Sequence, residues 1–137
     1  MSAATPSDTP GNTRPAPDAG HGGGALAPAD DIVVLLSNAP DLLLAKRIAH
    51  VLVEEHLAAC VNLGPAGLSM YMWQGALEGV EEIPLTMKTT LARAPALIAR
   101  LGELHPYEVP EVLVLPVSGG SASYLAWVRE QTRPGEA

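Results

Sequence analysis

Apolar runs and alternating patterns along the chain predict four β-strands. Residues 32–36 form a continuous apolar run, which is typical of a strand buried on both faces. Residues 59–73 read as one long strand with an irregular centre at 64–67, where glycine and proline interrupt it. Apolar and polar side chains alternate over 83–88, the period of a half-buried strand. Residues 111–117 supply the fourth strand.

Helical spacing of apolar residues predicts three helices. The first opens at 37–41, where a capping side chain, a proline and an acidic residue precede the apolar positions, and it ends near His56. The second opens near Ala94 and Pro95, and a short closing helix occupies 121–131. The two longer helices present one apolar face each: Leu44, Ile48, Val51 and Leu52 on the first, and Leu97, Ile98, Leu101 and Leu104 on the second.

The middle two strands are predicted to form a long hairpin, with a turn between them and a proline in the second strand. Residues 74–79 contain two glycines and are read as the turn. Pro84 removes a donor from its strand, so we expect a bulge or an unpaired position opposite it.

The order β-α-β-β-α-β predicts an α+β domain with the ferredoxin-like sandwich and an extra C-terminal helix. Right-handed crossovers place both long helices on one face of a four-stranded sheet. The other face stays bare, and the long hairpin overhangs the domain. An apolar bare face is an association surface, so we expect a symmetric oligomer.

The chain divides into a tail at 1–30 and a domain at 31–133. The tail holds five prolines and five glycines, and its large apolar residues are only Met1 and Leu26. Such a segment buries too little surface to offset its ordering entropy and is predicted to be disordered.

Composition and charge indicate which classes of partner to exclude and which cellular compartment to expect. The net charge is −7, and the eight Lys and Arg residues are scattered, which argues against nucleic acid. No apolar run approaches the ~20 residues of a membrane span, and no secretory signal is recognised, so we expect a cytoplasmic protein that does not bind membranes. The single cysteine, Cys60, excludes an intrachain disulfide.

Five short sequence motifs are more specific than the hydrophobic pattern. In order they are Leu-Ala-Ala-Cys-Val-Asn at 57–62, Ser-Met-Tyr-Met-Trp-Gln-Gly at 69–75, Glu82 with Met-Lys-Thr-Thr at 87–90, His-Pro-Tyr-Glu-Val-Pro-Glu at 105–111, and Tyr-Leu-Ala-Trp at 124–127. Together they resemble the CutA family of small divalent-cation tolerance proteins. The resemblance covers about 32–132, and its most specific piece is the string at 105–111.

This resemblance implies a ferredoxin-like homotrimer whose long hairpins extend the neighbouring sheets. It also implies copper binding and a role in metal tolerance. The alternative is a signalling protein like PII, which binds a small effector between subunits. In the family, metal ligation is proposed at two consecutive histidines and at an early cysteine. Here Leu104 stands at the first histidine and Ser37 at the cysteine, so that only His105 matches.

Two residues are candidate metal ligands. Cys60 supplies a soft thiolate of the kind that Cu(I) favours, although a lone thiol on a strand is more often a core residue. His105 can coordinate through a neutral imidazole, or its ring can instead cap the helix or fix the turn before Pro106.

A second set of candidates can line a cleft between subunits. Lys88 can hold an anion, and the carboxylates of Glu82 and Glu111 can hold a cation; the same charges can equally form ion pairs that order an interface. The aromatic residues Trp73, Tyr107 and Trp127 can stack on a base or simply pack between subunits.

The sequence offers little support for an enzyme. It contains no Gly-x-Ser-x-Gly elbow, no phosphate loop and no His-Glu-x-x-His. Acylphosphatases share this fold and hold phosphate with an arginine after the first strand, where this chain has no arginine. We therefore expect a binding protein without catalytic residues.

Overall fold

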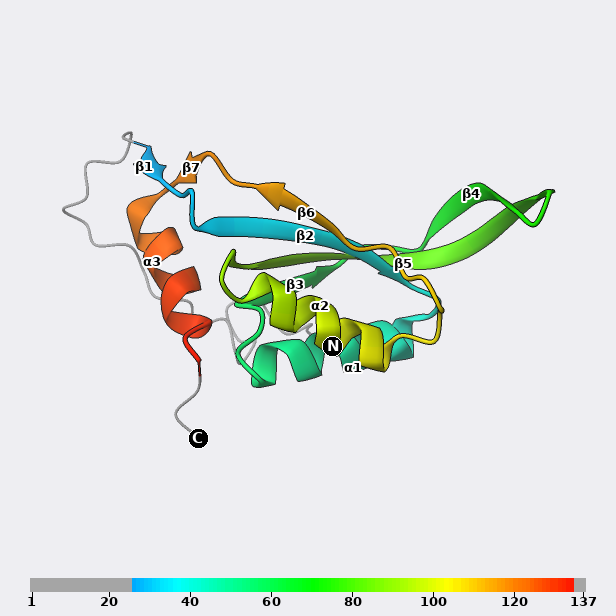
Figure 1. Ribbon diagram of the computed structural model, residues 1–137, viewed down its shortest axis with the longest axis horizontal. Helices are drawn as coiled ribbons and strands as arrows, with labels where there is room; N and C mark the ends of the chain where they lie inside the picture. Colours follow the sequence, from blue (N-terminus) through cyan, green and yellow to red (C-terminus); the bar gives the residue numbers. More distant parts are fainter. Residues whose placement is uncertain (1–25, 135–137) are drawn as a thin grey trace, which may run out of the picture.

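The computed structural model describes residues 26–134, and its elements follow the predicted order (Figure 1). They are β1 Ala27–Pro28, β2 Ile32–Ala39, α1 Leu42–Glu54, β3 Cys60–Leu63, β4 Gly67–Trp73, β5 Ala76–Thr90, α2 Ala94–Leu104, β6 Leu113–Pro116, β7 Gly119–Gly120 and α3 Ala122–Gln131.

The main sheet is antiparallel in the order β3-β5-β2-β6, and β4 pairs with the remaining part of β5. This is the ferredoxin-like strand order, in agreement with the sequence prediction. Helices α1 and α2 lie side by side against one face of the sheet (Figure 1). The opposite face is called the bare face below.

The core lies between the sheet and these two helices. Alternate residues of β2 and β5 point into it because successive side chains of a strand point to opposite faces. Its largest fully buried members are Leu35, Ile48, Leu52, Leu85, Met87, Leu97 and Leu101. The helical members of this set, Ile48, Leu52, Leu97 and Leu101, all belong to the apolar helix faces predicted from the sequence.

The first helix begins later than the sequence indicated. Strand β2 continues through Ser37 and Asn38 to Ala39, and the N-cap is Asp41, whose side chain accepts a 2.8 Å hydrogen bond from the Leu44 amide. Ser37 and Asn38 remain in the strand because they pair in register with Leu85 and Pro84 of β5.

Strand β5 is fifteen residues long and belongs to two parts of the molecule. Its second half lies between β2 and β3, whereas its first half pairs only with β4 and projects from the sheet (Figure 1). The predicted turn at 74–79 is too long, because β4 and β5 already pair at Trp73 and Ala76. Only Gln74 (φ 51°) and Gly75 (φ 83°) form it, as in the tight two-residue hairpin turns that require positive φ.

Pro84 sits in β5 without a bulge, because the register with β2 runs unbroken from Ile32–Thr90 to Ala39–Ile83. Its carbonyl accepts a 3.0 Å hydrogen bond from the Gly64 amide, just beyond the end of β3. The backbone of Pro84 therefore points toward β3, so that the missing donor removes no bond to β2. The expected bulge is absent, and Pro84 is paired in register with Asn38.

The folded domain starts at about Ala27 rather than at Asp31. Strand β1 pairs with β7, and Ala29 is fully buried in a small second cluster with Leu125 and Val128 of α3. Arg129 donates two hydrogen bonds to Asp31, at 2.6 and 2.8 Å, and lowers the pKa of that carboxyl. The predicted disorder of residues 1–25 lies outside the described residues.

Across residues 26–134, the longest helix is α1 with 13 residues, and no helix reaches the length and apolarity needed to cross a bilayer.

Candidate functional site

The loop that follows α2 is held against the end of β2 by His105. This ring is almost fully buried, and both of its nitrogens are engaged: Nδ1 accepts from the Tyr107 amide at 3.1 Å, and Nε2 lies 2.7 Å from the Asn38 carbonyl. A carbonyl only accepts, so Nε2 carries the proton and donates it. A metal at His105 would have to displace one of these two hydrogen bonds.

The hydroxyl of Tyr107 donates a 3.0 Å hydrogen bond to Oε2 of Glu82, whose side chain is buried although it carries a carboxylate. Burial, and next the hydrogen bond to Glu82, raise the pKa of Tyr107 to about 12. The rings of Tyr107 and His105 also meet edge to face, with centroids 4.7 Å apart. The tyrosine therefore stays neutral and donates to Glu82 over the physiological pH range.

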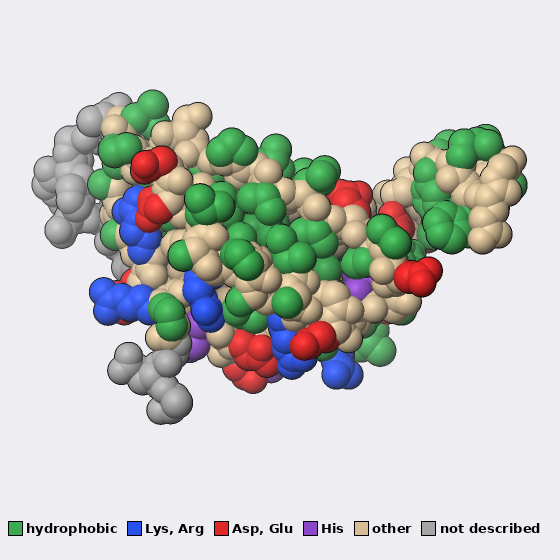
Figure 2. Space-filling view, viewed as in Figure 1, with side chains coloured by type: hydrophobic (Ala, Val, Ile, Leu, Met, Phe, Trp, Pro, Cys, Tyr) green, Lys and Arg blue, Asp and Glu red, His purple; other side chains and the backbone are tan. Residues whose placement is uncertain are grey.

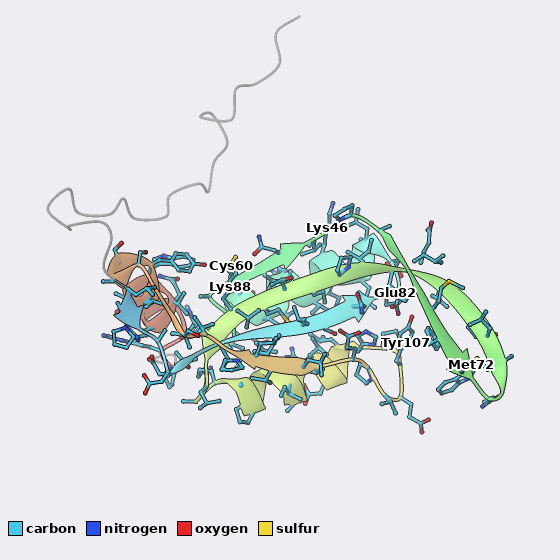
Figure 3. The ribbon with its side chains drawn as sticks, turned by 90° about the horizontal axis from the view of Figure 1, so that it is seen from above. Lys46, Cys60, Met72, Glu82, Lys88 and Tyr107 are labelled. Atoms are coloured by element: carbon cyan, nitrogen blue, oxygen red, sulfur yellow. The ribbon has the colours of Figure 1, made fainter. Side chains whose placement is uncertain are left out.

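Glu111 completes this group, because its Oε1 accepts from Nδ2 of Asn38 at 2.9 Å. We call Asn38, Glu82, His105, Tyr107 and Glu111 the hairpin-base cluster. It lies where the hairpin leaves the sheet, and Figure 3 shows Glu82 and Tyr107 there. Four of its five members are residues that the sequence singled out.

Asn38 is the member that the sequence reading missed. Its amide bonds to Glu111 and its carbonyl to His105, residues far along the chain. A local pattern holds no signal for contacts of such separation.

Two other predicted residues, Cys60 and Lys88, lie together on the bare face. Cys60 and Lys88 are cross-strand partners, and Oδ1 of Asn62 accepts from Lys88 Nζ at 2.6 Å and from Cys60 Sγ at 3.5 Å. Figure 3 shows Cys60 and Lys88 together, well away from Glu82 and Tyr107. In the sequence, Asn62 stands out only as the last residue of the string at 57–62.

The two candidate metal ligands, Cys60 and His105, are not brought together within one chain. Lys88, the partner of Cys60, pairs with Val34, whereas His105 bonds to Asn38. Four residues of β2 separate these points, about 13 Å at a strand rise of about 3.3 Å per residue. Any site that uses both residues needs more than one copy of the chain.

Ser37 does not serve as a replacement ligand on the surface. Its side chain is 2% exposed and points into the core between the sheet and the helices, where its hydroxyl has no hydrogen-bond partner.

The predicted aromatic residues are similarly spread. Trp73 flanks the hairpin turn, Tyr107 lies in the hairpin-base cluster, and Trp127 packs near Tyr124 on α3, with ring centroids 5.7 Å apart. Helix α3 and the hairpin turn lie at opposite ends of the molecule (Figure 1). One chain therefore provides no common stacking platform for a base.

Among residues 26–134, no three His, Cys, Asp or Glu side chains gather as a metal ion requires. The carboxylates of Glu82 and Glu111 share a cluster but are only two, and each already accepts a hydrogen bond.

Comparison with known proteins decides the family. The family model described as "CutA1 divalent ion tolerance protein" matches residues 33–131, more than two thirds of the chain. This protein belongs to the CutA1 family. The resemblance stated from the five strings is confirmed.

Two relatives, both named "Divalent-cation tolerance protein CutA", show the extent of the match. The protein from Pectobacterium atrosepticum is 45% identical over 106 residues, which are 77% of this chain and 96% of that protein. The protein from Thermus thermophilus is 46% identical over 99 residues, 72% of this chain and 96% of that protein.

Solved CutA structures agree with the fold. CutA from Xylella fastidiosa matches with a TM-score of 0.74 at 43% identity, over 75% of this chain and 99% of that one. CutA from Synechococcus elongatus matches with a TM-score of 0.77 at 34% identity, over 80% of this chain and 97% of that one. The ferredoxin-like prediction is confirmed by these CutA neighbours.

Proposed function

We propose that this protein contributes to divalent-cation tolerance by binding the cation between copies of the chain, without catalysing a reaction. The observation that carries the proposal is the hairpin-base cluster: hydrogen bonds of Tyr107, His105 and Asn38 link Glu82 to Glu111, yet among residues 26–134 no three His, Cys, Asp or Glu side chains gather as a metal ion requires. Carboxylate oxygens are ligands for divalent cations, zinc among them, and a neighbouring copy is the simplest source of the missing ligand.

The bare face supports association of copies. By strand register, Val34 and Leu36 of β2 share this face with Leu115 and Leu113 of β6, which are 42% and 55% exposed. Burying such contiguous apolar side chains is favourable by about 25 cal/mol per Å². Figure 2 shows further apolar side chains over the body and the projecting hairpin.

We propose that the assembly is a homotrimer, as the family resemblance implies. Sedimentation equilibrium of the full chain distinguishes three copies from two or one. Leu113→Glu with Leu115→Glu places two charges on the bare face, and we expect it to give a folded monomer. Leu43→Glu is the matched control, because Leu43 is a highly exposed apolar residue on α1.

The cation site is tested by calorimetric titration of zinc and of copper(II) into the full chain and its variants. We expect Glu82→Gln and Glu111→Gln each to weaken binding by about tenfold or more, because each removes a charged oxygen ligand. Glu78→Gln is the control, since Glu78 is an exposed carboxylate elsewhere on the hairpin.

The remaining outcomes are equally informative. Binding that survives both glutamate variants but is lost in Cys60→Ser or His105→Ala moves the site to the thiol and imidazole, and copper is then the expected ion. Wild-type binding of neither metal overturns the proposal. Binding of a small anion that is lost only in Lys88→Ala supports the effector alternative.

A further inference from the structure

The bare face carries a lysine among uncharged neighbours. Lys88 lies on β5 between Met87 and Thr89, which are fully buried on the core side, so its own side chain points to the bare face. It is half-buried there, and its register partners are Val34 of β2 and Cys60 of β3. The positive charge therefore stands on a surface that is apolar along β2 and uncharged along β3.

The ammonium group of Lys88 is only partly satisfied. Nζ donates to Oδ1 of Asn62 at 2.6 Å, and within residues 26–134 it forms no ion pair with a carboxylate. Glu82, the nearest carboxylate along this side of β5, is six residues away, about 20 Å at a strand rise of about 3.3 Å per residue, and Figure 3 shows the two apart. An ammonium group has three donors, so two remain for a ligand.

Two further hydrogen-bond donors lie beside this ammonium group. Thr86 is two positions from Lys88 on β5, so its side chain also points to the bare face, about 6.6 Å along the strand. Asn62 is the cross-strand partner of Thr86, and such partners have Cβ atoms about 4.5–5.5 Å apart. Because Oδ1 of Asn62 accepts from Lys88, its Nδ2 supplies donors. An ammonium, an amide and a hydroxyl group can therefore reach one small anion.

Association of copies makes the charge of Lys88 unfavourable unless it is neutralised. Val34, its partner on β2, lies beside Leu115 of β6, so the surface proposed above to join copies includes the surroundings of the ammonium group. Removing an unpaired charge from water is strongly unfavourable. Symmetric association also brings an identical ammonium group from each copy to the interface, where like charges repel. The interface therefore requires a negative counter-charge.

We propose that Lys88, Asn62 and Thr86 bind a small oxyanion of the phosphate or sulfate class, which neutralises the lysine charge when copies associate. Anion binding and association then strengthen each other by the same factor, because coupling between two binding equilibria is reciprocal. The inference rests on the association of copies proposed above. It does not depend on the divalent-cation site, whose residues it does not use.

The test combines calorimetric titration and sedimentation equilibrium of the full chain, with inorganic phosphate as the probe. Both are run in Tris–chloride buffer, and sodium chloride of equal ionic strength controls for general screening. Lys88→Gln removes the charge and keeps a long polar side chain. Lys46→Gln is the matched control, because Lys46 is an exposed lysine on α1, on the other side of the sheet.

We expect phosphate to bind saturably, with at most one ion per chain, and to lower the dissociation constant of the assembly by about fivefold or more. Lys88→Gln should lose both effects, whereas Lys46→Gln should retain them. Thr86→Val should weaken phosphate binding by about two- to tenfold, because it removes one donor. Asn62→Asp places a carboxylate on the ammonium group, so this variant should associate without phosphate and no longer respond to it.

Three results would overturn the site. The first is phosphate binding of equal strength in the wild type and Lys88→Gln, and the second is an assembly that responds equally to phosphate and to chloride. The third is an assembly that Lys88→Gln dissociates although phosphate has no effect on the wild type, because a carboxylate of the neighbouring copy then supplies the counter-charge. A wild type that stays monomeric with and without phosphate overturns the association as well, whereas an assembled wild type that binds no phosphate overturns this site alone.

Discussion

The backbone of Gly64 lies against the ring of Pro84: a Cβ atom built on Gly64 would stand 2.8 Å from Cγ of Pro84. The proline ring is tied to its own backbone and moves little. Glycine at 64 and proline at 84 therefore fit as a pair, joined also by the hydrogen bond from the Gly64 amide to the Pro84 carbonyl.

Replacing Gly64 by alanine should lower the free energy of unfolding by about 1–3 kcal/mol through overpacking against the ring. Urea unfolding measures the loss. Gly67→Ala is the control, because a Cβ there meets no atom within 4 Å. The double variant Gly64→Ala with Pro84→Ala should lose less than the sum of the two single variants. Additive losses would contradict the direct contact.

The sequence predicted the elements whose evidence is local. Two predicted strands are observed: the apolar run at 32–36 lies in β2, and the alternating segment at 83–88 lies in β5. The helical spacing of Leu97 and Leu101 correctly placed both side chains in the core. Strand order followed from right-handed crossovers. These features depend on periods of two and 3.6 residues, which the sequence displays directly.

Features that depend on distant pairing were misplaced or missed. Ser37 and Asn38 have helix-capping side chains, but pairing with β5 keeps them in β2. Strand β1 has only two residues, and it forms because β7 lies beside it. The role of Asn38 in the hairpin-base cluster likewise depends on partners that only the fold brings near.

Tyr107 should make stability depend on pH in the alkaline range. Its pKa is raised to about 12 in the folded chain, against about 10 for an unfolded tyrosine. The folded state thus holds this proton more tightly. Its contribution is complete below about pH 10 and is lost as the pH rises toward about 12.

Urea unfolding at several pH values in that window measures the effect. Tyr107→Phe should flatten the decline, because it removes the titrating hydroxyl. Tyr71→Phe, a tyrosine variant that leaves the Tyr107–Glu82 bond in place, should retain it. Equal slopes for the wild type and Tyr107→Phe would show that this hydroxyl does not control the dependence.

His105 should matter more for stability than for cation binding. His105→Ala removes the acceptor of the Tyr107 amide and the donor to the Asn38 carbonyl, and we expect a loss of about 1–3 kcal/mol in the free energy of unfolding. His50→Ala is the matched control, since His50 is exposed and faces Glu54 on α1. Its effect should stay below about 0.5 kcal/mol. Zinc binding by folded His105→Ala should equal that of the wild type.

The hairpin turn should be sensitive to backbone conformation alone. A Cβ on Gly75 meets no atom within 4 Å, but the φ of 83° is unfavourable for alanine. Gly75→Ala should destabilise the tip by about 1–2 kcal/mol. Emission of Trp73 in a Trp127→Phe background reports the local transition during urea titration. A midpoint unchanged by Gly75→Ala would mean that the tip tolerates the strain or rearranges.

The two environments of β5 lead to a gradient of amide hydrogen exchange along one continuous strand. Residues 83–90 lie within the sheet above the packed core, and global unfolding must expose their amides. Residues 76–81 have only β4 beside them, so local opening of the hairpin is enough. Protection in the isolated chain should therefore fall between Glu82 and Ile83. If copies associate over the hairpin, protection against exchange should rise mainly at the amides of residues 76–81. The exchange rates of these amides therefore report assembly.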